Sequence, residues 1–123
     1  MIFDHVVLSV SDVNKSKDFY SDALLPLGIM LIREEDGCIG FGANKKPSFW
    51  ICSDNVIQKP MHIAFIAEDR KAVEMFHEAA IAAGGKNNGN PGIREHYHPH
   101  YYGAFVIDPD GHNIEAVCRK PVL

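Results

Sequence analysis

The chain has 123 residues, of which 46% are hydrophobic and 23% are charged, with a formal net charge of −4 at pH 7. This length and composition predict about one domain with its own hydrophobic core and exclude a disordered chain. The slightly acidic charge provides no basic surface for nucleic acid or an anionic membrane, so we expect neither partner.

The first half of the chain predicts a strand, a helix and three short strands. Residues 3–10 are rich in β-branched and apolar side chains, and they are too short and too polar for a signal sequence or a membrane span. A helix follows, because apolar side chains recur at helical spacing between a cap, Asn14 or Asp12, and a stop at Gly28. Strand-like runs then occupy residues 29–33, 38–42 and 48–52.

The second half predicts a similar series of elements. A strand over 61–67 precedes a helix that Asp69 caps and that ends at Gly84 and Gly85. Residues 86–101 are rich in glycine and proline, so we expect a long loop with at most a short strand. Two further strands, over 102–107 and 113–118, are joined by the turn sequence Asp-Pro-Asp-Gly at 108–111, which predicts a hairpin.

The two halves repeat each other at an offset of 57 residues. The matching pairs are His5 and His62, Asp12 and Asp69, Phe19 and Phe76, and Gly28 and Gly85. Because a strand, an acidic cap, a helix and a glycine recur in order, the repeat predicts two copies of one βαβββ unit. We therefore expect a single α+β domain made of two modules, over about 1–57 and 58–123.

The alternation of side chains along the strands predicts a metal site. His5 shares one strand face with Val7 and Ser9, and the apolar residues between them face the helix. The same rule places His62 and Glu115 on the corresponding face of the second copy. Two histidines and one carboxylate form the set that binds a divalent ion facially, and a mixed nitrogen and oxygen site accepts Fe, Zn, Ni, Mn or Co.

A second cluster lies in the predicted loop, at Arg-Glu-His-Tyr-His-Pro-His-Tyr-Tyr over 94–102. As a substrate loop, it would use Arg94 to neutralise an anionic group and His98 or Tyr101 to transfer protons. The alternatives are an aromatic loop packed at the sheet edge and a histidine-rich tract that binds adventitious metal. Trp50 is either an apolar wall of the cleft or a core residue, and His77 and His112 are interpreted as surface or turn residues without a role.

At these residues the sequence resembles the vicinal oxygen chelate superfamily, which includes glyoxalase I, extradiol dioxygenases and bleomycin-resistance proteins. The resemblance covers nearly the whole chain. It depends on the segments His-Val-Val-Leu-Ser-Val from His5, His-Ile-Ala-Phe from His62, and Asp-Pro-Asp-Gly-His-Asn-Ile-Glu ending at Glu115. It implies two βαβββ modules that form curved mixed sheets around a cleft, with His5, His62 and Glu115 as the metal ligands.

Departures from the family pattern restrict the reaction. Glyoxalase I has a fourth ligand, a glutamate, where this chain has Trp50 or Phe49, so methylglyoxal–glutathione isomerisation is not expected. The extradiol dioxygenase pattern places its acid/base histidine at His98, but its tyrosine position is Phe105. Tyr101 or Tyr102 would have to supply that hydroxyl, and Trp50, Tyr102 and Phe105 are expected to contact the substrate.

Two function classes follow from the resemblance. The first is a metal-dependent enzyme, lyase- or isomerase-like or an extradiol-type dioxygenase, that acts on a small substrate with vicinal oxygens. The second is a metal-free protein that binds small molecules, as in bleomycin sequestration. Family members with two modules are commonly homodimers, so we expect a homodimer whose ligands come from one chain or from two. The three cysteines, Cys38, Cys52 and Cys118, are odd in number without CxxC spacing, which favours a reduced cytoplasm.

Overall fold

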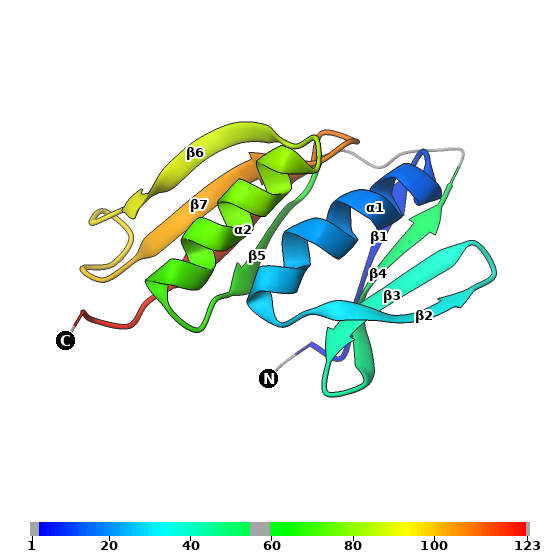
Figure 1. The fold of residues 1–123 in the computed structure, drawn as a ribbon, viewed down its shortest axis with the longest axis horizontal. Helices are drawn as coiled ribbons and strands as arrows, with labels where there is room; N and C mark the ends of the chain where they lie inside the picture. Colours follow the sequence, from blue (N-terminus) through cyan, green and yellow to red (C-terminus); the bar gives the residue numbers. More distant parts are fainter. Residues whose placement is uncertain (1–2, 55–59, 123) are drawn as a thin grey trace.

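A computed structural model describes residues 3–54 and 60–122. Each half of the chain contributes one α-helix and four strands (Figure 1). The first half contains β1 (Val6–Val10), α1 (Val13–Leu24), the short helix η1 (Leu25–Leu27), β2 (Met30–Glu35), β3 (Cys38–Ala43) and β4 (Lys46–Ser53). The second half contains β5 (His62–Ile66), α2 (Arg70–Ala82), β6 (Lys86–Ile93), β7 (Tyr102–Ile107) and β8 (Asn113–Cys118). The predicted module boundary at 57 and 58 lies outside the described residues.

The strands form two four-stranded sheets with the same topology. Sheet A has the order β1-β4-β3-β2, and sheet B has the order β5-β8-β7-β6. In each sheet the first strand of the module pairs in parallel with the last, and the other pairs are antiparallel. The prediction of an α+β fold in which a βαβββ unit is used twice is therefore confirmed.

The two helices begin in the same way. Asp12 accepts hydrogen bonds from the backbone N–H groups of Asn14 and Lys15, so Asp12 rather than Asn14 caps α1. Asp69 accepts from the N–H of Ala72 at the start of α2. These side chains satisfy N–H groups that have no partner within the helix, which explains why the acidic residue recurs in both copies.

Both helices lie on the same side of the sheets and leave the opposite faces uncovered (Figure 1). Leu8 and Val10 of β1 are fully buried beneath the helices, and so are Ile114 and Ala116 of β8. This arrangement confirms the predicted strand faces. We call the face of each sheet that the helices do not cover its outer face.

Polar contacts, some of them buried, join the two modules. The hydroxyl of Tyr20 on α1 donates to Oδ2 of Asp108 in the β7–β8 turn, at 2.5 Å. The hydroxyl of Ser11 donates to Oδ1 of Asp110 at 2.6 Å. His112 is fully buried; its Nε2 lies 3.4 Å from the carbonyl oxygen of Ser9 in the first module, and its Nδ1 accepts from the N–H of Met61 in the second module at 3.0 Å. The interpretation of His112 as a surface or turn residue was therefore incomplete, because it lies in the turn but inside the molecule.

Two further sequence predictions were wrong. Residues 86–93 form the strand β6 rather than part of a long loop, because the backbone pairs with β7 through bulges that tolerate glycine and proline. Cys38 and Cys52 form a disulfide and only Cys118 is a free cysteine, whereas the cysteine pattern favoured reduced thiols. Within the described residues, no helix is long and apolar enough to cross a membrane.

Candidate functional site

His62 and Glu115 meet on the outer face of sheet B. They come from neighbouring parallel strands, with Ala64 of β5 opposite Glu115 of β8. Nε2 of His62 lies 2.7 Å from Oε1 of Glu115. The carboxylate is almost completely buried, with 1% of its surface exposed, whereas the imidazole is about half exposed. The buried carboxylate of Glu115 is therefore in contact with the half-exposed imidazole of His62.

Tyr101 holds the other oxygen of the same carboxylate. Its hydroxyl donates to Oε2 of Glu115, and its ring is 7% exposed. The turn before β7 sets its position, because its N–H donates to the carbonyl of His98 at 3.1 Å. Burial, followed by the hydrogen bond and the negative charge of Glu115, raises the pKa of Tyr101 to about 12. Tyr101 therefore remains a neutral donor at physiological pH and fixes the orientation of Glu115.

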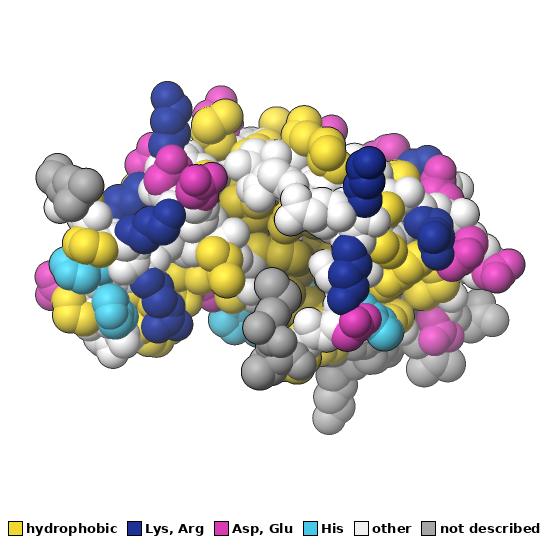
Figure 2. Space-filling model, turned by 90° about the horizontal axis from the view of Figure 1, so that it is seen from below, with side chains coloured by type: hydrophobic (Ala, Val, Ile, Leu, Met, Phe, Trp, Pro, Cys, Tyr) yellow, Lys and Arg dark blue, Asp and Glu magenta, His cyan; other side chains and the backbone are white. Residues whose placement is uncertain are grey.

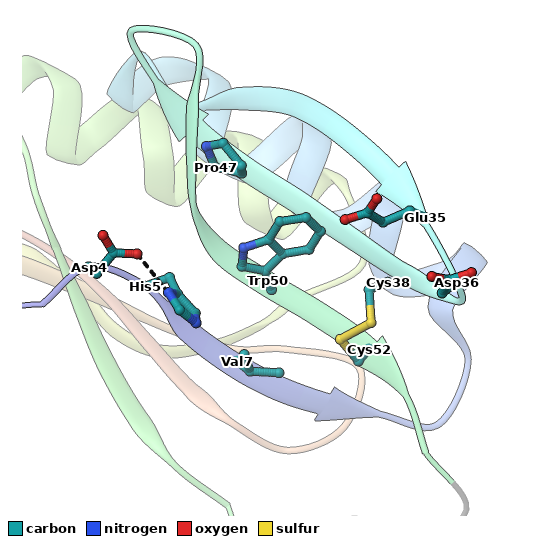
Figure 3. A pocket seen from close by; sticks show the side chains of 9 residues that line it. All are labelled: Asp4, His5, Val7, Glu35, Asp36, Cys38, Pro47, Trp50 and Cys52. Atoms are coloured by element: carbon teal, nitrogen blue, oxygen red, sulfur yellow. Dashed lines mark hydrogen bonds and ion pairs between the residues drawn. A yellow bond between two sulfur atoms is a disulfide. The ribbon is translucent and has the colours of Figure 1, made fainter.

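His5 lies one residue before β1 of sheet A, in a pocket that does not include His62 or Glu115. Its Nδ1 is 2.8 Å from Oδ1 of Asp4, whose Oδ2 accepts from Nζ of Lys46 at 2.7 Å. The hydrogen bond from Lys46, and next the one from His5, lower the pKa of Asp4 to about 2. The pocket has a volume of about 470 Å³ and contains Val7, Trp50 and the Cys38–Cys52 disulfide beside His5 (Figure 3).

Trp50 lines this pocket, and its indole packs against Gly40 of the neighbouring strand. A Cβ atom at Gly40 would lie 2.9 Å from the Cη2 atom of the indole and 2.9 Å from Cβ of Pro47. The absence of a side chain at Gly40 therefore allows the indole to lie close to β3. This contact explains how a large aromatic side chain lines the pocket without filling it.

The strand register identifies Trp50 as the counterpart of Glu115. Val7 pairs with Trp50 in sheet A, and Ala64, its equivalent in the repeat, pairs with Glu115 in sheet B. Phe49 is 4% exposed and points into the core. Of the two residues that the sequence left open, Trp50 is therefore the one at the position equivalent to Glu115.

The three predicted metal ligands do not meet in the described part of one chain. His62 and Glu115 are in contact, but His5 is hydrogen-bonded to Asp4 on the other sheet. Among residues 3–54 and 60–122, no group of three or more histidine, cysteine, aspartate or glutamate side chains is arranged to hold a metal ion. One chain therefore presents two of the predicted ligands together and the third separately.

The remaining predicted site residues are divided between the two faces of sheet B. Phe105 pairs with Glu115 across β7 and β8, and its ring lies 6.0 Å from that of His62. Tyr102 points to the helix side, where its hydroxyl donates to Glu74 at 2.5 Å. The outer face therefore contains Phe105 but not Tyr102.

Arg94 and His98 make mainly local contacts. The guanidinium of Arg94 donates to the carbonyl oxygens of Gly92, Gly103 and Asn90 at 2.8, 3.1 and 2.9 Å, and lies 5.2 Å from the ring of Phe105. Nδ1 of His98 accepts from the N–H of His100 at 3.0 Å. The sequence did not predict that Tyr101 would bond to Glu115, since no spacing rule links a loop residue to a strand fourteen positions later.

Between the two halves, hydrophobic side chains gather in a hollow, with histidine and charged side chains on both sides of it (Figure 2). Large apolar side chains are exposed on both outer faces, since Val7 is 49% exposed and Ile66 is 81% exposed.

One family model and several solved structures match nearly the whole of this chain. The model of the glyoxalase/bleomycin resistance protein/dioxygenase superfamily matches residues 2–116. A glyoxalase/bleomycin resistance protein from Albidiferax ferrireducens T118 is 29% identical, with a TM-score of 0.84 over 98% of this chain and 100% of that one. A family enzyme from Burkholderia phytofirmans PsJN is 17% identical, with a TM-score of 0.74 over 95% of this chain and 98% of that one. Among curated proteins, no sequence matches. The chain therefore belongs to the glyoxalase/bleomycin resistance protein/dioxygenase superfamily.

Proposed function

We propose that this chain is a homodimeric, metal-dependent enzyme, lyase- or isomerase-like, that acts on a small molecule with vicinal oxygens. His62 and Glu115 of one copy and His5 of the other would hold the ion. The observation that carries the proposal is the buried carboxylate of Glu115, which converges with the half-exposed imidazole of His62.

The chemistry of this pair suits a divalent cation. A buried carboxylate is costly unless it is paired or binds a metal, and the contacts of Glu115 are one imidazole and one neutral hydroxyl. An ion between His62 and Glu115 would compensate the buried negative charge. Imidazole and carboxylate ligands fit Fe, Zn, Ni, Mn or Co.

Separation of His5 from this pair favours a site shared between two copies. Val7, which lines the same pocket as His5, and Ile66, at the other end of β5 from His62, expose apolar surface on the outer faces. Apposition of sheet A of one copy and sheet B of another would cover that surface and bring His5 to the His62–Glu115 pair. A twofold dimer would form two such sites.

The chain's own residues suggest a division of roles in the cleft. A bound divalent ion supplies a Lewis acid that stabilises negative charge on a chelated substrate oxygen. Trp50 and Phe105 would form apolar walls that exclude water, and His98 is the residue that we assign to proton transfer. Tyr101 is a positioning residue, since its hydroxyl is bonded to Glu115 and keeps its proton. Because Trp50 replaces the additional glutamate, the reaction differs from that of glyoxalase I.

The metal content of ligand variants, alone and mixed, tests which residues bind the ion and whether two copies share the site. Protein without a histidine tag is expected to hold roughly one ion per chain, whereas H5A and E115Q each lose it. If equal amounts of H5A and E115Q chains are unfolded and refolded together, about half of the dimers are heterodimers. Each heterodimer has one complete site of its two, so about a quarter of the wild-type metal content should return. H77A is the matched control, because His77 contacts Asn87 on the surface, and it should retain the metal.

The same experiment separates the possible failures. Metal loss in both variants without recovery on mixing would place all three ligands in one chain and contradict the shared site. Metal that stays absent from wild-type protein after incubation with each candidate ion would contradict metal dependence. It would leave the second candidate, a metal-free binding protein, which is favoured by the pocket that contains Trp50, Val7 and Pro47.

A further inference from the structure

The disulfide lies in the wall of the His5 pocket, at the far end from His5. Cys38 and Cys52 are direct partners across antiparallel β3 and β4, with Cα atoms 4.1 Å apart. The next pair on the same face is Gly40 and Trp50, so the sulfurs and the indole are neighbours (Figure 3). The pocket therefore contains an aromatic ring and a disulfide side by side.

Both sulfur-bearing residues can be reached from solvent. Cys38 and Cys52 are half-buried and line the pocket. Cys118 is 1% exposed, and its Sγ lies 3.9 Å from the carbonyl oxygen of Glu68. A small thiol can approach the disulfide but not Cys118. The chain thus contains a buried cysteine that serves as an internal control.

The sheet holds the two cysteines together with or without the bond between them. On one side of the cysteine pair, the N–H of Ser53 donates to the carbonyl of Gly37 at 3.0 Å. On the other side, Ile39 of β3 pairs with Ile51 of β4. On its other side, Cys52 pairs with Ser9 of β1. Because β4 is held between two strands, the disulfide can open without unfolding the hairpin, and the sulfurs remain close enough to join again.

We propose that Cys38 and Cys52 form a redox-active pair whose reaction partners are low-molecular-weight thiols and their disulfides. A thiolate attacks one sulfur of the pair, forming a mixed disulfide and releasing the other cysteine as a thiolate. A second thiol attacks the mixed disulfide and releases the first cysteine. In total, two thiols are oxidised to one disulfide, two electrons reduce the pair, and the thiols' protons pass to the cysteine sulfurs.

The state of the pair changes the wall of the pocket. The closed bond ties β3 to β4 beside Trp50, and the open form places two thiols there instead. The disulfide lies in the pocket that also contains His5, the third ligand of the proposed metal site, but thiol exchange at its sulfurs uses none of the three proposed ligands. Trp50 is the only tryptophan of the chain, and a nearby disulfide quenches indole emission, so its fluorescence reports the state of the pair.

A redox titration of the folded full chain tests the proposal. The protein is equilibrated in buffers with increasing ratios of reduced to oxidised glutathione, and Trp50 emission is recorded with far-ultraviolet circular dichroism. We expect emission to rise reversibly while the dichroism stays constant. Native alkylation followed by mass spectrometry should then show label on Cys38 and Cys52 in the reduced protein and none on Cys118.

Two variants complete the experiment. C118S should give the same transition as the wild type, and C38S/C52S should show the high emission in every buffer. A pair that is reduced only when the dichroism is lost would be a structural staple and would overturn the proposal. The proposal is also overturned if oxidised glutathione does not restore the bond in folded protein, or if C38S/C52S keeps the transition.

Discussion

Trp50 occupies in the first module the register position that Glu115 occupies in the second. Both residues point to the outer face of their sheet, but Trp50 forms the wall of a pocket, whereas Glu115 is a buried carboxylate paired with His62. The repeated fold therefore presents two different surfaces. One module supplies a pocket with a tryptophan and a histidine, and the other supplies a histidine with its carboxylate.

Substitution of Trp50 by glutamate should strengthen metal binding. A carboxylate at this position would lie on the face that carries His5 and would add a fourth ligand to the proposed set. We expect the affinity for a divalent ion to rise roughly tenfold, or about 1.4 kcal/mol, as measured by isothermal titration calorimetry. W50Q is the matched control, since it removes the indole without adding charge. Equal affinities for W50E and W50Q would contradict the proposed position of the ion.

Removal of the Tyr101 hydroxyl should reduce stability in a pH-dependent way. Y101F loses a buried hydrogen bond to the Glu115 carboxylate, which is worth about 1.5–3 kcal/mol in the free energy of unfolding. Folding raises the pKa of Tyr101 from 10.0 to about 12, so this contribution is complete below pH 10 and is lost as the pH rises towards 12. Urea unfolding at a series of pH values gives the difference between wild type and variant.

Y97F provides the control for this series, because Tyr97 is 60% exposed. Its unfolding free energy should stay within about 0.5 kcal/mol of the wild type at every pH below 10. The difference in unfolding free energy between wild type and Y101F should shrink from pH 10 to pH 12, so a difference that grows over this range would contradict the prediction. It would show that the hydroxyl does not act as the donor to Glu115.

Much of the fold is predictable because the repeat and the strand alternation are local patterns. Asp69 predicts the start of the second helix, and the start of the first is narrowed to Asn14 or Asp12, of which Asp12 is the cap. The parity of β1 correctly separates His5 from the buried Leu8. Contacts between distant segments leave no such pattern. The pairing of Cys38 with Cys52 depends on the register of β3 and β4, which their spacing alone does not determine.

Candidate ligands are predictable as residues but not as an assembled site. The repeat places His5 and His62 at equivalent positions, but it does not determine how two modules of one chain are placed relative to each other. Tyr101 reaches Glu115 only because a turn brings it back over β8. β6 was missed because its pairing uses backbone groups of a glycine- and proline-rich segment, and not an alternation of apolar side chains.

A methyl group at Gly40 should displace the indole of Trp50. The added Cβ would lie 2.9 Å from the ring and 2.9 Å from Pro47, which is closer than such atoms approach. Overpacking of this kind costs about 1–3 kcal/mol in unfolding free energy, and Trp50 emission should shift as the indole moves. In G40A/W50A the indole is absent, so the methyl group at position 40 no longer clashes with it. A double-mutant cycle should therefore show a coupling free energy of at least about 0.5 kcal/mol between the two substitutions. Additive effects would mean that Gly40 does not support Trp50.

Removal of the Tyr20 hydroxyl should weaken the junction between the modules. Tyr20 is fully buried on α1, and its hydroxyl donates at 2.5 Å to Asp108, a carboxylate that is 5% exposed in the second module. Burial, and next the charge of Asp108, raise the pKa of Tyr20, so it stays a neutral donor. The free energy of unfolding of Y20F, measured in urea, should therefore be lower by about 1.5–3 kcal/mol, because the Asp108 carboxylate stays buried with one partner fewer.

Y102F is the control, because it removes an exposed hydrogen bond to Glu74 within one module. It should change the free energy of unfolding by no more than about 0.5 kcal/mol. Equal losses in the two variants would show that the bond between Tyr20 and Asp108 does not hold the modules together.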